Sequence, residues 1–266
     1  MKKKIALAAA AASLMFAGAA SAADMAPRYT KAPPVVAPIF SWTGFYIGIN
    51  GGGGSAHKCW DLVSVAGVAL PAAFAEGCHD ATGGTVGGQI GYRWQAAAWV
   101  FGLEAQGNWA DFSGSNLSNN LAFATPYINR TKVDSFGLFT GQVGYTWNTF
   151  LVYVKGGAAV THDKYDAFTT APFGIFPSGT AFDRASETRW GGTIGVGGEY
   201  AFSPNWSFGV EYNHLFMGNR TVTTTAVGNL GLVAGSVARG LNIRQDVDIV
   251  TARINYKFGG PVVAKY

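Results

Sequence analysis

Apolar and polar residues alternate in two neighbouring runs of the chain, residues 88–94 and residues 99–109. In the first run, Ile90, Tyr92 and Trp94 occupy every second position, and polar residues or glycine stand between them. A period of two is typical of a β-strand that has one apolar and one polar face. Because only four residues link the two runs, the pattern predicts a β-hairpin that is apolar on one side.

The ending of the first run recurs along the chain at a nearly constant interval. A tyrosine followed two residues later by an aromatic residue occurs at Tyr92, Tyr145, Tyr200 and Tyr256, at intervals of 53, 55 and 56 residues. Each of the first three endings is followed by a short link and a new run that begins with an aromatic residue. The interval therefore indicates a repeated hairpin rather than an isolated one.

With one more strand at residues 42–54, the repeats supply four strands in each direction. An even number of strands, with short turns and aromatic residues at one end, is typical of a transmembrane β-barrel. A propeller of four blades would need about twice as many strands. The sequence therefore predicts an all-β fold, an eight-stranded antiparallel up-and-down transmembrane β-barrel.

Aromatic residues gather at the predicted short-turn end, where they are expected to form a girdle at the periplasmic interface of the membrane. The predicted girdle comprises Tyr92, Trp94, Trp99, Tyr145, Trp147, Tyr200, Phe202, Trp206, Tyr256 and Phe258. The apolar positions of the predicted strands carry no charged residue, as a lipid-facing surface requires. A soluble, lipocalin-like binder would instead turn this apolar face inward.

The polar face of the predicted strands carries a balanced set of charges, three basic and three acidic. These residues are Arg93, Glu104, Lys155, Glu199, Glu211 and Arg253. An eight-stranded barrel has an interior just wide enough for side chains, so we expect opposite charges to pair and fill the lumen. The alternative is a small diffusion pore, in which the same charges leave a file of water for ions or small solutes.

The chain begins with the features of a secretory signal: three lysines, an apolar stretch and a small-residue cleavage site at residues 20–22. We therefore predict a signal peptide at residues 1–22, a proline-rich periplasmic leader at 23–39, the barrel at 40–258, and residues 259–266 as a tail or the end of the last strand. Without the three signal lysines, 16 of the 19 basic residues remain against 15 acidic ones. This near-neutral balance argues against nucleic-acid binding.

Four longer stretches are predicted as extracellular connections, residues 55–82, 113–132, 161–188 and 218–245. The first contains Cys59 and Cys78, and two thiols in an exported loop predict a disulfide. A metal site in which His57 and His79 join the cysteines is the alternative, but it would need reduced thiolates. Alternation weakens at residues 133–140 and 244–249, where a β-bulge is an open interpretation.

The first strand and several strand ends resemble those of a known family. These segments are SWTGFYIGINGGGG after the proline-rich leader, the endings GYRW and GYTW, and INYKFGG near the C-terminus. In them the chain resembles the outer-membrane immunogenic proteins, which are RopB-like and opacity-protein-like porin-family barrels. The resemblance implies an eight-stranded barrel in a Gram-negative outer membrane. It implies little about activity.

We expect a structural and surface-exposed role, without a catalytic site, metal or cofactor. The four histidines show no spacing that joins them to a nucleophile and a carboxylate, although a lipid-modifying enzyme at the barrel rim is a rival hypothesis. Expected partners are outer-membrane lipid and lipopolysaccharide, the barrel-assembly machinery, and host surface molecules. The aromatic residue that the assembly machinery reads is either Phe258 or Tyr266.

Overall fold

The computed structural model describes residues 40–118, 126–172, 175–228 and 233–259. The predicted signal peptide, the leader and Tyr266 lie outside these residues. No helix in the described part of the chain is long and apolar enough to cross a membrane.

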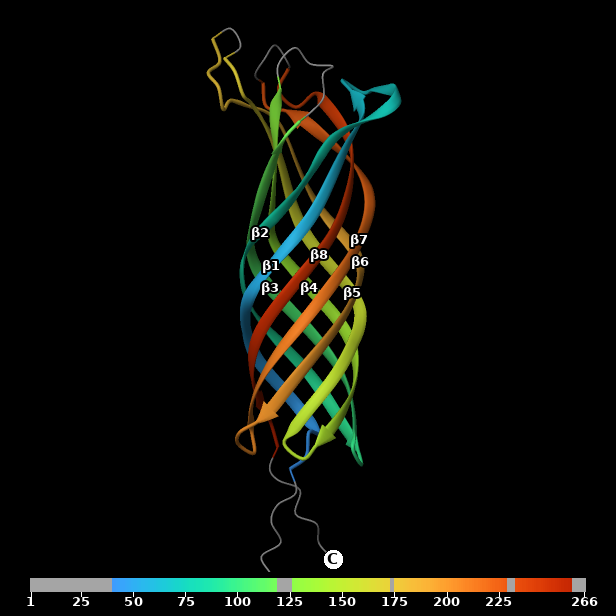
Figure 1. Cartoon of the computed structure of the whole chain (residues 1–266), viewed down its shortest axis with the longest axis vertical. Helices are drawn as coiled ribbons and strands as arrows, with labels where there is room; N and C mark the ends of the chain where they lie inside the picture. The colour runs from blue at the N-terminus through green and yellow to red at the C-terminus, as the bar shows by residue number, and fades with distance from the viewer. Residues whose placement is uncertain (1–39, 119–125, 173–174, 229–232, 260–266) are drawn as a thin grey trace, which may run out of the picture. The chain divides into compact units, whose positions relative to one another are not determined.

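The described residues form eight antiparallel strands in one closed barrel, in which each strand pairs with its neighbours in sequence and the last pairs with the first. Figure 1 shows the strands winding around the barrel axis. Their bounds are β1 Gly44–Val65, β2 Val68–Ala96, β3 Trp99–Leu117, β4 Tyr127–Trp147, β5 Phe150–Thr169, β6 Ala181–Ala201, β7 Trp206–Ala226 and β8 Val237–Lys257. The predicted fold class is confirmed.

The strands are about twice as long as a membrane requires. They contain 19 to 29 residues, whereas a tilted strand crosses the hydrocarbon core in about 9–11 residues. Most of the outward-facing large apolar side chains lie in the half of each strand nearest the short turns, for example residues 99–109 of β3 and 150–160 of β5. An outward apolar band fits the bilayer, and because the short turns of outer-membrane barrels face the periplasm, the other half of each strand is expected to continue beyond the bilayer on the extracellular side.

The outer face of the barrel changes from apolar to largely polar along the strands, as β5 illustrates. In the membrane-spanning half, Val154 faces outward with 60% of its surface exposed, and the neighbouring Lys155 is buried in the lumen. In the extracellular half, Lys164 faces outward and Tyr165 is buried. The half near the short turns thus has the outer surface of a membrane barrel, and the other half has the outer surface of a water-soluble one.

The four long connections expected from the sequence are largely strand, so that expectation was wrong. Residues 55–82 form the upper parts of β1 and β2, which are joined by a two-residue turn at Ala66 and Gly67. The other three connections shorten to the residues between Leu117 and Tyr127, between Thr169 and Ala181, and between Ala226 and Val237. The error has a physical cause: above the membrane many outward positions are polar or charged, so the rule that apolar residues face outward no longer detects the strands.

One of the two stretches with weak alternation contains an irregularity. The pairing of β4 with β5 shifts register between Val133 and Ser135, which moves Val133 and Phe136 onto the same inner face. Residues 244–249 alternate regularly, with Val247 buried, and the register shift lies on the facing strand between Phe216 and Gly218.

Candidate functional site

The lumen is the candidate functional site, and its lower half contains a four-membered ring of charges. The Arg253 guanidinium donates from Nη1 to Glu104 Oε2 at 3.0 Å and to Glu211 Oε2 at 2.7 Å. Lys155 Nζ lies 3.1 Å from Glu104 Oε1 and 2.5 Å from Glu211 Oε1. The four side chains come from β8, β3, β7 and β5 and are buried. Each cation therefore bridges the same two carboxylates.

The other two predicted lumen charges form a second group nearer the short-turn end. Arg93 Nη2 donates to Glu199 Oε2 at 2.8 Å, and the guanidinium lies over the Tyr46 ring at 4.5 Å from its centroid. Tyr46 in turn donates to Glu104 Oε2 at 2.7 Å, and Asn255 Nδ2 donates to Glu199 Oε1 at 2.9 Å. All six charges singled out from the sequence thus lie in one connected network of three cations and three anions.

This charge balance explains how the network can be buried. An isolated ion in a low-dielectric interior is very costly, and mutual attraction offsets that cost only when geometry and hydrogen bonds are good. Here tyrosine, asparagine and serine side chains satisfy further lone pairs of the carboxylates. The lumen at this level is occupied by paired side chains, as expected for a barrel of eight strands.

Trp42 closes the lumen below the charges. It precedes β1 and was expected inside the first strand, but its side chain is only 3% exposed and packs with Val100, Leu151 and Tyr153. Its indole Nε1 donates to Thr146 Oγ1 at 2.8 Å, which fixes the ring across the barrel end. Sequence reasoning missed this role because a tryptophan beside a strand start also fits an interfacial girdle.

An apolar layer lies above the lower charges. It consists of the buried residues Ala56, Ala81, Phe112, Val133, Phe136, Leu138, Ala159, Leu215, Met217, Val247 and Ile249. These side chains come from all strands except β6, since each of the other seven turns at least one apolar residue inward at this height. Packed apolar side chains exclude water, so this layer separates the lower charges from the extracellular half of the lumen.

The extracellular half of the lumen contains further ion pairs that the sequence analysis did not single out. Lys58 Nζ lies 2.6 Å from Asp163 Oδ1, and both side chains are inaccessible to solvent. Burial lowers the pKa of Lys58, and the attraction of Asp163 opposes that shift. The pair lies on a second apolar cluster that includes Trp60 and Tyr165, and the ammonium group is 4.8 Å from the Tyr165 ring centroid.

Near the extracellular end, Arg239 is the centre of another charged group. Its Nε and Nη2 donate to the two Asp183 carboxylate oxygens at 2.6 and 3.1 Å, and Nη1 lies 3.2 Å from Glu76 Oε2. The Tyr127 hydroxyl also donates to Glu76. All of these residues fall in or next to stretches expected to be loops, which is why they were missed.

The predicted girdle residues lie around the short-turn end, and most are exposed to the membrane side. Trp94 stacks with Phe101, and Tyr145 packs edge to face with Trp147. Phe258 contacts Phe45 and Tyr256, and its backbone N–H donates to the Phe45 carbonyl, directly after β8 ends. Exposed aromatic residues also mark the opposite edge of the apolar band. This second set, absent from the sequence analysis, comprises Trp109, Trp190 and Phe216.

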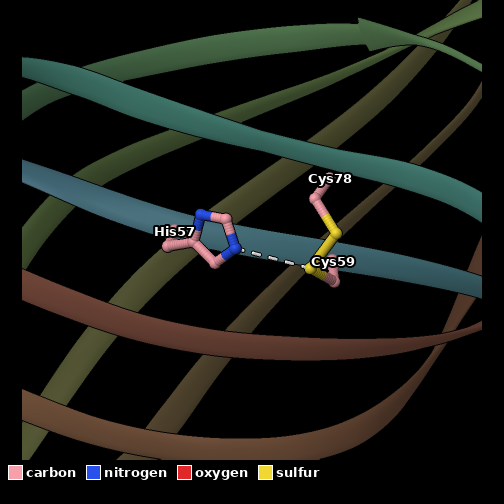
Figure 2. A group of neighbouring side chains, drawn as sticks. All are labelled: His57, Cys59 and Cys78. Atoms are coloured by element: carbon pink, nitrogen blue, oxygen red, sulfur yellow. Dashed lines mark hydrogen bonds between the residues drawn. A yellow bond between two sulfur atoms is a disulfide. The ribbon is translucent and has the colours of Figure 1, made fainter.

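Cys59 and Cys78 face each other across β1 and β2 and form a disulfide. His57 lies beside them on the outer face, as Figure 2 shows. His79 points into the barrel instead, where it contacts Asn116 and Thr131. The four-residue metal set considered from the sequence is therefore divided between opposite faces of the sheet.

The outward-facing histidines have different kinds of partner. His57 and His214 each place Nδ1 within 2.7 Å of a carboxylate, on Asp80 and Asp248 respectively. His162 contacts the hydroxyl groups of Ser186 and Thr188. None of these three histidines therefore contacts both a carboxylate and a serine hydroxyl.

Comparison with known proteins agrees with the architecture. Residues 8–235 match the family described as "Outer membrane protein beta-barrel domain". The chain is 34% identical over 262 residues to the 31 kDa outer-membrane immunogenic protein of Brucella melitensis, covering 92% of this chain and 95% of that protein. It is 27% identical to a 22 kDa outer membrane protein of Rhizobium leguminosarum bv. viciae, covering 84% of this chain and 81% of that protein.

Among solved structures, the chain is similar to the outer membrane protease OmpT of Escherichia coli, with 12% identity and a TM-score of 0.48. The match covers 82% of this chain and 98% of the OmpT chain. Similarity of this size does not extend to activity. The match over most of the chain and the 34% identical relative are the findings that establish both family and location. The chain is an outer-membrane β-barrel protein and belongs to the outer membrane protein beta-barrel domain family.

Proposed function

We propose that this barrel is a non-catalytic envelope protein that seals its own lumen and presents the extracellular half of its strands to the surroundings of the cell. The observation that carries the proposal is the sequence of side-chain layers inside the barrel. From the short-turn end these are Trp42, the lower charge network, the apolar layer, the Lys58–Asp163 pair and the Arg239 group.

The apolar layer is the strongest argument against the diffusion pore. Ions crossing the lumen would have to pass from the lower charges through a packed cluster that includes Phe112, Phe136 and Leu138, all at most 4% exposed. Dehydrating an ion in such surroundings costs several kcal/mol or more. The lower network contains as many cations as anions. It therefore has no net charge that would attract a permeating ion of the opposite sign.

The outer surface supports the proposed partners. The apolar band with an aromatic girdle at each edge fits a bilayer. Above it, outward basic residues such as Lys132, Lys164 and Arg184 alternate with aspartates on neighbouring strands. We propose that this charged zone contacts the sugar and phosphate groups of lipopolysaccharide, and that the strand ends beyond it meet antibodies or host surface molecules. Phe258, directly after β8, is the aromatic we propose for recognition by the assembly machinery.

Conductance in planar lipid bilayers tests the sealed lumen. The purified protein should insert without steady open-channel steps, while a general porin inserted by the same procedure serves as the positive control. Steady conductance whose ion selectivity changes in Glu104→Gln would overturn the proposal in favour of the diffusion pore. Lipid A that changes in a deletion strain and is restored by the wild-type gene would support the rim enzyme instead.

A further inference from the structure

The outer face of the β1–β2 hairpin carries three potential metal ligands in one place. Cys59 and Cys78 are paired directly across the two strands, and His57 lies two residues before Cys59 on the same face. One ligand atom from each residue lies within 4.8 Å of the other two, and the His57 Nε2 is 3.5 Å from Cys59 Sγ. Figure 2 shows the imidazole directed at the sulfur atoms.

The distance between His57 Nε2 and Cys59 Sγ fits the coordination shell of zinc. Zinc binds thiolate sulfur at about 2.3 Å and imidazole nitrogen at about 2.0–2.1 Å in tetrahedral geometry, which places neighbouring ligand atoms roughly 3.6 Å apart. The separation of 3.5 Å between His57 Nε2 and Cys59 Sγ is that of two ligands on one such ion.

Asp80 supplies the outer support that a histidine ligand needs. Its Oδ1 lies 2.6 Å from His57 Nδ1, so Nε2 is the nitrogen left facing the sulfur atoms. Histidine ligands of zinc commonly donate their second nitrogen to a carboxylate in this way, which fixes the ring and raises its basicity. The pairing of His57 with Asp80 and of Cys59 with Cys78 is one continuous stretch of ladder, so the strands hold all four residues in register.

We propose that reduction of the Cys59–Cys78 disulfide creates a binding site for Zn²⁺ on the outer surface, with His57 as the third ligand and Asp80 orienting it. A dithiol supplies two electrons and two protons: its own sulfurs become a disulfide, and the protein disulfide becomes two thiols. Zn²⁺ then displaces both thiol protons to solvent and binds two thiolates and one neutral imidazole. The fourth position is open to water. The oxidised protein lacks the thiolates, so metal binding and the disulfide exclude each other.

Binding of Zn²⁺ and the redox state of Cys59 and Cys78 are therefore linked. Because Zn²⁺ binds only the reduced form, each tenfold rise in free Zn²⁺ above its dissociation constant should raise the midpoint potential of the disulfide by about 30 mV. This linkage would be absent if the metal bound elsewhere on the barrel.

Cobalt(II) is the spectroscopic probe for the site. The folded protein in detergent micelles is reduced with a water-soluble phosphine, which takes oxygen from water as it is oxidised, and is then titrated with Co²⁺. One equivalent should produce the visible bands of tetrahedral cobalt and a thiolate charge-transfer band, and Zn²⁺ should abolish both. The oxidised protein should produce neither. Heat-modifiable gel mobility, recorded on each sample, should show that the reduced barrel remains folded.

Matched variants identify the ligands. His57→Ala should weaken cobalt binding at least tenfold and change the visible bands, and Asp80→Asn should weaken it about tenfold to a hundredfold. His162→Ala removes another outward histidine, one with hydroxyl neighbours, and should leave the titration unchanged. Equal binding by oxidised protein, unchanged bands in His57→Ala, or loss of the fold on reduction would each overturn the proposal.

Discussion

At the scale of single residues, the lumen depends on charges that are shared rather than paired one to one. Arg253 and Lys155 each contact both Glu104 and Glu211. Removing one member of a buried ion pair is costly because its partner is left without compensation. Sharing enlarges this effect, since the loss of one cation affects two carboxylates.

Arg253→Met should therefore lower the free energy of unfolding by about 3–5 kcal/mol. Arg244→Met is the matched control: it lies on the same strand, but its side chain is 70% exposed, and it should change stability by no more than about 0.5 kcal/mol. Urea unfolding in lipid vesicles, followed by tryptophan fluorescence, measures both. Equal effects of the two substitutions would show that the ring does not stabilise the barrel.

Tyr127, outside the membrane-spanning half, gives a pH-dependent prediction. Burial, followed by the nearby Glu76 charge, raises the pKa of Tyr127 to about 12, against 10.0 for an unperturbed tyrosine, although Arg239 partly opposes the shift. Because the folded-state pKa is raised, the stabilisation is fully present below pH 10 and is lost as the pH rises from 10 towards 12.

The loss should amount to about 2–3 kcal/mol of unfolding free energy, since one pKa unit corresponds to about 1.4 kcal/mol. Stability measured at intervals between pH 9 and pH 12 should fall less steeply in Tyr127→Phe than in the wild type. Tyr145→Phe, at an exposed girdle position, should retain the wild-type slope. A parallel decline in all three proteins would contradict the assignment to Tyr127.

At the scale of elements, alternation predicted the membrane-spanning half of each strand and the inward direction of all six lower charges. It did so because that half has lipid outside and paired charges inside, so apolar residues face outward and charged residues face inward. The same rule failed above the membrane, where Lys164 faces water and Tyr165 faces the core. The Lys58–Asp163 pair could not be found from the sequence, because its two residues were assigned to separate loops.

The inward-facing glycines of the strands make a testable packing prediction. A Cβ atom added to Gly87 would collide with the Gly107 carbonyl and with Asn108, whereas one added to the outward-facing Gly107 would meet nothing within 4 Å. Gly87→Ala should therefore reduce stability by about 1–3 kcal/mol through overpacking. Gly107→Ala should be nearly neutral. Folding yields and urea midpoints of both variants test this prediction. A larger effect of Gly107→Ala than of Gly87→Ala would contradict the assignment of Gly87 to the inner face and Gly107 to the outer face.

At the scale of the whole molecule, the reversal of polarity divides the barrel into two halves with different surroundings. The half near the short turns meets lipid on its outside and encloses ion pairs. The other half meets water on its outside and encloses apolar clusters together with further ion pairs. Such a barrel raises its strand ends well above the bilayer, which is the geometric basis of the proposed surface role.

The depth of two positions on β5 tests this division most directly. In a background with Cys59→Ser and Cys78→Ser, single cysteines at Val154 and Lys164 carry a spin label on the same outer face, separated along the strand by about 33 Å at 3.3 Å per residue. In lipid vesicles, the label at 154 should relax with oxygen dissolved in the hydrocarbon core, and the label at 164 should relax with a water-soluble nickel chelate. A label at 164 within the hydrocarbon, or one at 154 in water, would contradict the account.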